Sequence, residues 1–108
     1  MDKPVETEQE ALAEAMVSRR LTIQNQKGLH ARAAARFVKL AETFDAEVTV
    51  TKGTTTVSGT SIMGLMMLGA ATGTALVLGA TGREAAAALD ALAMLIEDRF
   101  GEDQEAPS

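Results

Sequence analysis

The stretch EVTVTKGTTTVS, residues 47–58, decides the fold because it predicts two adjacent antiparallel strands in the middle of the chain. Apolar and polar residues alternate over 47–51, which places Val48 and Val50 on one face of a strand. The Lys-Gly pair that follows forms a turn, and a β-branched stretch then runs back over 54–58. We therefore predict a β-hairpin with further elements on either side.

One strand and one helix are predicted on the amino-terminal side of this hairpin. Leu21 and Ile23 alternate with polar residues over 20–24, as in a strand that is buried on one face. A helix is predicted over 31–43, because its apolar residues recur with the spacing i, i+3, i+4, i+7. These apolar residues are Ala34, Phe37, Val38 and Ala41.

A short helix, a strand and a long helix are predicted on the carboxyl-terminal side. Ser61 can cap the short helix over 62–68, and a glycine-containing loop then leads to an apolar strand over 74–78. The long helix is predicted over 83–100 from its apolar periodicity. Its buried face consists of Ala85, Ala88, Leu89, Leu92 and Ile96.

The chain carries no charged residue between Lys52 and Arg83, which raises the alternative of a membrane span over 62–80. The stretch GAATGT, residues 69–74, interrupts that segment as a loop would. The basic flanks that anchor a span are weak, because Arg83 is followed at once by Glu84. The pattern favours a buried helix, turn and strand, and we expect no membrane span.

The predicted order of elements is β-α-β-β-α-β-α, which indicates the α+β class with one sheet covered on one face by helices. A length of 108 residues and a hydrophobic content of 46% suit one globular domain. We expect an acidic N-terminal extension over 1–18, the folded domain over 19–100 and a flexible acidic tail over 101–108.

Composition argues against several classes of function. With no cysteine and a single histidine, the chain lacks the ligands of a transition-metal site, and we expect neither a metal nor a cofactor. The formal net charge of −5 argues against a nucleic-acid partner. The N-terminus does not resemble a secretory signal, and the absence of cysteine suits a reducing compartment, so we expect a cytoplasmic location.

The single histidine, His30, lies in GLHARAAARF, residues 28–37, where the first predicted helix begins. The free backbone N–H groups of Ala31 and Ala33 in the first helical turn, together with the helix dipole, form a site that attracts anions. Arg32 adds a full positive charge and a planar set of donors suited to phosphate. This arrangement favours phosphoryl transfer through the histidine itself.

Other roles for His30 have less support from the residues around it. No Gly-x-Ser-x-Gly motif of a hydrolase occurs, and neither does a glycine-rich phosphate loop of a nucleotide-binding protein. A histidine near the start of a helix is nevertheless common in proteins that do no histidine chemistry. The residues alone therefore leave open a small interaction domain in which His30 is incidental.

Two motifs resemble those of one protein family. GLHARAAARFVKLA, residues 28–41, resembles the active-site segment of the HPr phosphocarriers of the phosphoenolpyruvate-dependent phosphotransferase system. SGTSIMGLMMLGA, residues 58–70, resembles the regulatory-serine segment of the same family. The resemblance extends over about 20–100. It implies an open-faced sandwich, in which a four-stranded antiparallel sheet is covered on one face by three helices.

The resemblance also implies a role for individual residues. His30 would be phosphorylated on Nδ1 by Enzyme I and would pass the phosphoryl group to an EIIA-type protein. Arg32 would bind that group, and Ser61 would be the serine that HPr kinase/phosphorylase modifies in some bacteria. The protein would then be a phosphocarrier rather than an enzyme.

The short helix after Ser61 would carry the surface that docks on partner proteins. The candidates are Ile62, Met63, Met66 and Met67, because methionine suits a surface that must fit several partners in turn. The alternative is that these side chains belong to the core, which we expect for at least two of the four.

One residue departs from the family pattern, since Ala33 stands where the family usually has proline. Alanine is an excellent helix former, so we expect the helix to form, while the rigidity with which His30 is held before transfer stays open. FDAEV, residues 44–48, is similar to the nitrogen-branch members (NPr), whereas SIMGLMML is similar to the carbon-branch members, so the branch stays open. The alternative function is an HPr-like regulatory module that modulates a partner enzyme without obligatory phosphotransfer.

Overall fold

The computed structural model describes residues 16–103, so most of the predicted N-terminal extension and the last part of the predicted tail lie outside the described residues. The described elements follow the predicted order β-α-β-β-α-β-α. They are β1 (Val17–Thr22), α2 (Ala31–Ala41), β2 (Glu47–Lys52), β3 (Thr55–Ser58), α3 (Ile62–Met67), β4 (Ala75–Thr81) and α4 (Ala85–Glu97), followed by a single turn, η1 (Arg99–Gly101).

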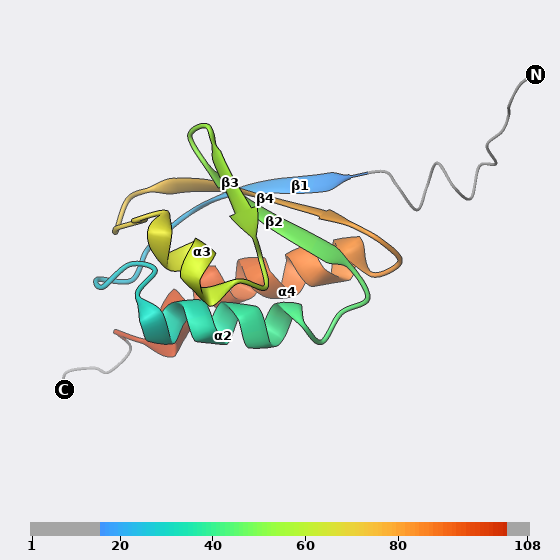
Figure 1. The fold of residues 1–108 in the computed structure, drawn as a ribbon. Helices are drawn as coiled ribbons and strands as arrows, with labels where there is room; N and C mark the ends of the chain where they lie inside the picture. The colour runs from blue at the N-terminus through green and yellow to red at the C-terminus, as the bar shows by residue number, and fades with distance from the viewer. Residues whose placement is uncertain (1–15, 104–108) are drawn as a thin grey trace, which may run out of the picture.

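The strands form one antiparallel sheet of four strands in the order β1-β4-β2-β3. Figure 1 shows α2, α3 and α4 on one face of this sheet, while no helix of the described part covers the other face. The predicted α+β open-faced sandwich is therefore confirmed. Because β1 ends beside the start of β4, the loop that precedes α2 lies against the loop that follows α3.

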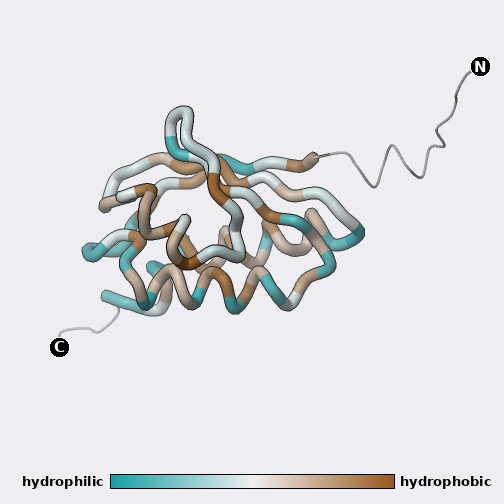
Figure 2. Tube along the Cα trace, in the orientation of Figure 1, coloured by the Kyte–Doolittle hydropathy of each residue, from teal (hydrophilic) through white to brown (hydrophobic). Residues whose placement is uncertain are grey.

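The strand register converts the alternating pattern into one apolar layer. Val50 pairs with Leu78 on one side and with Val57 on the other. Leu21 pairs with Leu76 in the same way. Paired residues point to the same face of a sheet, so these side chains all face the helices, and Figure 2 shows apolar positions recurring along the strands. Each fully buried aliphatic side chain of this kind contributes about 1.5–3 kcal/mol.

The two longer helices bury the faces that the sequence predicts, with one addition in each. The buried residues of α2 are Ala33, Ala34, Phe37, Val38 and Ala41. Those of α4 are Ala85, Ala88, Leu89, Leu92, Ala93 and Ile96. The many alanines let the helix backbones approach the sheet and each other closely, while the larger side chains fill the remaining space.

β1 and β4 are both longer than the alternation predicts. β1 begins at Val17 rather than at residue 20, and β4 continues to Thr81 rather than ending at residue 78. Val17 pairs with Ala80, and β2 pairs with β4 as far as Thr81. The reason is that pairing with neighbouring strands satisfies backbone N–H and C=O groups whatever the side-chain pattern is.

The last helix is shorter than predicted. α4 ends at Glu97, and Arg99, Phe100 and Gly101 all have positive φ, at 57°, 56° and 76°. This left-handed turn places the Phe100 side chain in the core. The prediction of a helix up to residue 100 was wrong because burial of this aromatic side chain outweighs the local preference of the backbone.

No helix within residues 16–103 is long and apolar enough to cross a membrane. The uncharged segment 62–80 instead forms α3, a loop and most of β4, in the predicted order. The prediction that this helix is buried was wrong, because Leu65 is the one buried residue of α3. Leu65 and Leu76 from this segment are buried in the core. Packing inside the domain therefore explains part of its apolar character, while Ile62, Met63, Met66 and Met67 of α3 are exposed.

Candidate functional site

His30 is the N-cap residue of α2. Its backbone is extended, with φ of −83° and ψ of −178°, and its carbonyl oxygen accepts a hydrogen bond from the N–H of Ala34 at 2.8 Å. The imidazole Nδ1 accepts a hydrogen bond from the backbone N–H of Arg32 at 3.3 Å. The imidazole thus caps the first turn as the side chains of serine or asparagine do elsewhere, and Nδ1 faces the positive end of the helix dipole.

The loop before His30 is held tightly against the loop after α3. Gly28 has a φ of +67°, and a Cβ at this position would lie 2.5 Å from the carbonyl oxygen of Ala70. The N–H of Leu29 donates to the same oxygen at 2.9 Å. Only glycine combines this backbone conformation with so close an approach, and the contact determines where the chain enters α2.

The second ring nitrogen of His30 contacts a carboxylate from the far end of the domain. Nε2 lies 2.6 Å from Oε2 of Glu102, and the two side chains are 25% and 14% exposed. Since Nδ1 accepts a hydrogen bond from a backbone N–H, the neutral ring satisfies both contacts only with its proton on Nε2. Nδ1 then carries the unprotonated electron pair, and it becomes the nucleophilic atom when the hydrogen bond from the Arg32 N–H is released.

Glu102 is held in turn by Asn25, the one polar residue among 16–103 that is fully buried. Asn25 Nδ2 donates to Oε1 of Glu102 at 3.0 Å and to the carbonyl oxygen of Gly28 at 2.8 Å. Both of these neighbours are acceptors, which fixes the orientation of the amide. The loop before α2 therefore binds both His30 and the carboxylate that orients it.

The pKa of Glu102 lies below its usual value of 4.5. Burial by itself raises the pKa of this carboxyl, but other contacts outweigh that effect. These are the hydrogen bonds from Asn25 and His30 and the electrostatic interactions with His30 and Arg36. Glu102 is therefore a carboxylate at neutral pH, and it accepts the Nε2–H of His30.

Glu102 and Asn25 were both missed from the sequence. Glu102 falls in the segment predicted as a flexible tail, and Asn25 in a polar loop. Only two weak sequence signals pointed to these residues. A glycine directly follows Phe100, and an asparagine lies a few residues before Gly28. Neither signal reveals that the segment after α4 brings Glu102 to the start of α2.

The two arginines of α2 have different surroundings. Arg36 donates from Nη1 to the carbonyl oxygen of Phe100 and so holds the left-handed turn after α4. Arg32 is exposed, and within residues 16–103 its guanidinium contacts no acidic side chain. Its role in binding an anion stays a prediction.

Ala31 and Ala33, the predicted backbone donors, lie in the first turn of α2. The N–H groups of a first turn have no acceptor within the helix. Ala33 is completely buried and adopts helical structure. The helix therefore forms without the proline that the resemblance leads one to expect at this position.

Ser61 is the N-cap residue of α3, as predicted. Its Oγ accepts a hydrogen bond from the N–H of Gly64 at 2.9 Å. The residue is half-buried, because α3 packs on β3 and α2. The Ser61 hydroxyl thus has a structural role in starting this short helix.

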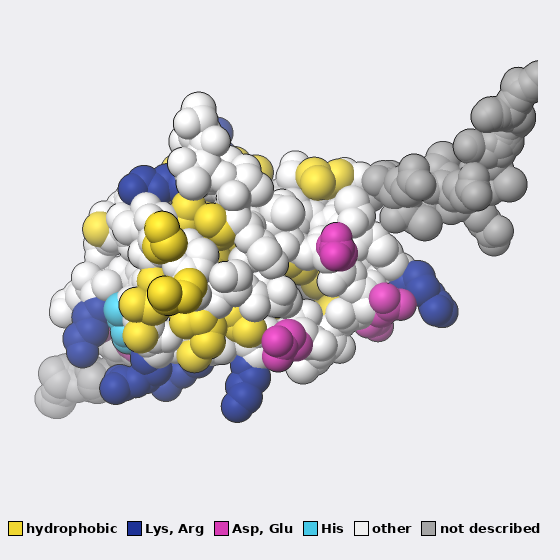
Figure 3. Space-filling view, in the orientation of Figure 1, with side chains coloured by type: hydrophobic (Ala, Val, Ile, Leu, Met, Phe, Trp, Pro, Cys, Tyr) yellow, Lys and Arg dark blue, Asp and Glu magenta, His cyan; other side chains and the backbone are white. Residues whose placement is uncertain are grey.

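α3 exposes all the apolar residues that the sequence predicts as a docking surface. They are Ile62, Met63, Met66 and Met67, which we call the α3 patch. Met67 is 80% exposed and Met63 is 69% exposed, whereas Leu65 on the opposite side is buried. The alternative that these methionines are core residues is therefore wrong. Figure 3 shows the patch gathered over α3 beside the histidine, with basic side chains along its lower edge.

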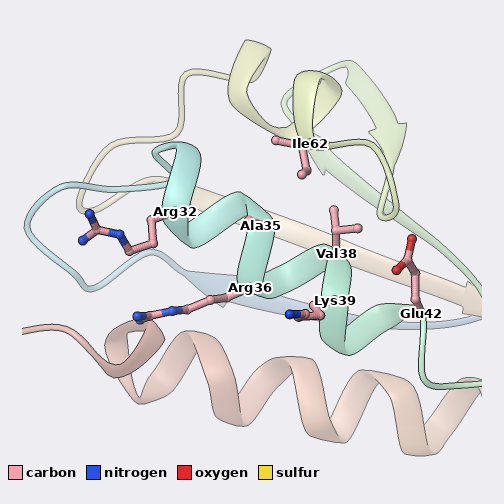
Figure 4. A pocket seen from close by; sticks show the side chains of 7 residues that line it. All are labelled: Arg32, Ala35, Arg36, Val38, Lys39, Glu42 and Ile62. Carbon is pink, nitrogen blue, oxygen red and sulfur yellow. The ribbon is translucent and has the colours of Figure 1, made fainter.

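An open groove of about 430 Å³ lies between α2 and α3. It is lined by Arg32, Ala35, Arg36, Val38, Lys39, Glu42 and Ile62. In Figure 4, Ile62 projects from α3 toward α2, while the arginines and the lysine project from α2. The α3 patch is thus bordered by positive charge on the side of His30. Within residues 16–103, no three His, Cys, Asp or Glu side chains are grouped so that they could hold a metal ion.

Comparison with known proteins assigns the family of this fold and site. A family model described as "PTS HPr component phosphorylation site" matches residues 17–98. The chain belongs to the HPr family. Proteins of this family are phosphocarriers of the phosphotransferase system, and they carry a group rather than catalyse a reaction.

Relatives of this HPr-family chain carry both names used in the family. It is 47% identical over 89 residues to phosphocarrier protein HPr of Neisseria meningitidis serogroup A, covering 82% of the chain and 100% of the relative. It is 43% identical over 86 residues to phosphocarrier protein NPr of Shewanella violacea, covering 80% and 94%. A crystal structure of HPr-C-His from Thermoanaerobacter tengcongensis aligns with a TM-score of 0.78 at 41% identity, covering 81% and 98%.

Proposed function

We propose that this HPr-family protein accepts a phosphoryl group from Enzyme I on Nδ1 of His30 and passes it to an EIIA-type protein. The observation that carries the proposal is the orientation of the ring. Nδ1 holds an unprotonated electron pair at the N-terminus of α2, where it accepts a hydrogen bond from the Arg32 backbone N–H that an incoming phosphoryl group would replace. The family membership of the chain supports the same role.

The chemistry requires only a nucleophile and a site for a dianion. The Nδ1 electron pair attacks the phosphorus of a phosphohistidine on the donor protein. As that bond forms, the donor's phosphorus–nitrogen bond breaks and its electron pair returns to the donor's imidazole. The Arg32 side chain and the first-turn N–H groups of Ala31 and Ala33 would then bind the phosphoryl oxygens.

The α3 patch and the groove beside it would dock the two partner proteins in turn. Both must reach the same Nδ1 atom, so both must cover the surface around it. That surface is apolar over α3 and positively charged along α2. It fits a partner with an apolar centre and acidic side chains at its edge. A phosphocarrier that serves such partners would be cytoplasmic.

Phosphorylation of Ser61 by a partner such as HPr kinase/phosphorylase would regulate this docking. The hydroxyl lies at the start of α3, directly before Ile62 of the α3 patch. A phosphate there is compatible with the helix dipole but adds negative charge beside a surface proposed to bind acidic partners. Ser61→Asp, compared with Ser61→Thr, should raise the KM for phosphorylated Enzyme I if this proposal is correct.

The proposed function is tested by intact mass after incubation with phosphoenolpyruvate, Mg²⁺ and a bacterial Enzyme I. Enzyme I from the carbon branch and from the nitrogen branch are used in parallel, with His30→Ala as the control. One acid-labile phosphoryl group on the wild type, lost in His30→Ala, is the expected result. Absence of any gain with both donors would favour the regulatory binding module, which needs no phosphotransfer.

A further inference from the structure

We propose that Glu102, anchored by Asn25, is a positioning residue for phosphoryl transfer at His30. It holds the proton of the imidazole on Nε2 and neutralises the positive charge that the ring acquires when Nδ1 is phosphorylated. This inference rests on the proposed phosphocarrier function and adds to it a residue from the C-terminal segment.

The geometry joins residues from opposite ends of the domain. Glu102 Oε2 lies 2.6 Å from Nε2 of His30, 72 positions earlier in the chain. Its other oxygen accepts from the buried amide of Asn25 at 3.0 Å. With both oxygens bound and the side chain only 14% exposed, the carboxylate has one orientation toward the ring. This is the arrangement by which a carboxylate selects the tautomer of a histidine in metal sites and in Ser-His-Asp triads.

The conformation of the backbone after α4 places the Glu102 side chain beside His30. Arg99 and Phe100 adopt a left-handed conformation that is unfavourable for residues other than glycine. The conformation is maintained by burial of the Phe100 side chain and by the bond from Arg36 to the Phe100 carbonyl oxygen. Just beyond Glu102, the Asp103 carboxylate accepts from the N–H of Gln26 at 2.7 Å. The segment that carries Glu102 is therefore tied to α2 and to the loop before it.

The charge balance of the transfer explains what a carboxylate contributes. The neutral ring starts with its proton on Nε2, and no proton leaves when Nδ1 bonds to phosphorus. The phosphorylated ring is consequently a cation, with its Nε2–H still bonded to Glu102. Because its pKa is lowered, Glu102 is ionised at neutral pH. Its negative charge therefore stabilises this cation and the transition state that leads to it.

The test compares Glu102→Gln, Glu102→Ala and a matched control, Glu97→Gln. Glu97 is an exposed acid at the end of α4, and the hydrogen bonds that hold the His30–Glu102 pair come from Asn25 and from the backbone N–H of Arg32 rather than from Glu97. The first readout is the ¹⁵N chemical shift of the two ring nitrogens of His30, which reports the tautomer and needs no partner protein. We expect the Nε2–H tautomer in the wild type and in Glu97→Gln, and a mixture of tautomers in Glu102→Ala.

The second readout is the steady-state transfer rate from phosphorylated Enzyme I, separated into kcat and KM. We expect Glu102→Gln to lower kcat by about tenfold with KM unchanged, by analogy with carboxylates that orient a histidine elsewhere. The conservative Glu102→Asp variant should recover part of the rate. Unchanged tautomer ratios or an unchanged kcat in Glu102→Ala would overturn the proposal.

Failure of the proposed function itself is recognised separately. In that case the wild type gains no phosphoryl group from either Enzyme I. Phosphoramidate, a small-molecule donor, then serves as the probe, and ³¹P NMR distinguishes phosphorylation on Nδ1 from that on Nε2. Product on Nδ1 in the wild type and on both nitrogens in Glu102→Ala supports the positioning role. The same product mixture in both proteins contradicts it.

Discussion

Lys52, at the end of β2, donates a hydrogen bond from Nζ to the carbonyl oxygen of Leu68 at 2.8 Å. Leu68 is the C-cap residue of α3, and the other end of this helix is capped by Ser61. A helix of 6 residues has no stability of its own in water, so these two caps and the burial of Leu65 hold it in place. The α3 patch is therefore positioned by residues outside the helix.

Replacement of Lys52 should loosen α3 selectively. Lys52→Met keeps the aliphatic length but removes the donor, which we expect to destabilise the protein by about 1.5 kcal/mol. Hydrogen exchange of the α3 amides should accelerate more than that of the α2 amides. Lys39→Met, at an exposed lysine of α2, is the control. Equal effects of the two substitutions on α3 exchange would contradict this role.

Gly28 and Gly53 offer a matched comparison of backbone strain with and without a close contact. Both have positive φ, at 67° and 61°, but only Gly28 has a backbone neighbour where a Cβ would stand. Gly53→Ala should cost about 1 kcal/mol, and Gly28→Ala at least about 2 kcal/mol more. Urea unfolding measures both. Similar losses would show that the approach of Gly28 to Ala70 is not tightly constrained.

The lowered pKa of Glu102 predicts how stability depends on pH. A carboxyl whose folded-state pKa is below its unfolded value favours folding when it is ionised. Its contribution is fully present above about pH 4.5 and is lost as the pH falls through the lowered folded-state pKa. His30, Arg36 and Asn25 face this carboxyl and supply the effect.

Urea midpoints of the wild type and Glu102→Gln, measured from pH 3 to pH 7, check this dependence. The wild type should be more stable at neutral pH, and the difference should shrink in the acidic range. A difference that stays constant with pH would mean that the ionisation of Glu102 is not coupled to folding.

Substitution of Arg32 should affect mainly phosphoryl acceptance, whereas substitution of Arg36 should affect mainly the free energy of unfolding. Arg32→Ala removes an exposed side chain and should change the unfolding free energy by less than about 0.5 kcal/mol, while it slows phosphoryl acceptance by about tenfold or more. Arg36→Ala removes the donor to the Phe100 carbonyl and should cost about 1.5 kcal/mol. Calorimetry and the transfer assay on both variants check the contrast, and a large stability loss in Arg32→Ala would refute it.

The α3 patch should affect partner affinity without affecting the fold. Met67→Glu introduces a negative charge at an exposed position and should raise the KM for phosphorylated Enzyme I on the order of tenfold. Met94→Glu is the matched control, because Met94 is 67% exposed on α4. If both substitutions raise KM equally, general charge rather than docking at α3 is responsible.

Most of the fold could be predicted from the sequence because its signals are local. Alternation over the hairpin, the apolar stripe of α2 and the Ser61 cap each depend on residues within a few positions of one another. They were predicted within a few residues of their observed bounds. The ends of β1 and β4 were not, because pairing between strands extends beyond the apolar pattern.

The candidate site was predictable only in part, because local sequence signals reveal only contacts between residues that are close in the chain. His30 and Arg32 lie in one helical turn, so their proximity follows from helix geometry. The residue that orients the ring lies 72 positions away and returns through a left-handed turn that no local propensity favours.

By itself the sequence determined the α+β order of elements, the histidine at the start of α2 and the serine at the start of α3. It could do so because helical and strand periodicities, together with capping, act over short distances along the chain. Only the tertiary structure decided that Glu102 and Asn25 meet at His30 and that α3 exposes its methionines. Those contacts arise because burial of Phe100 and Leu65 directs distant backbone segments, and such burial depends on the packing of the whole domain.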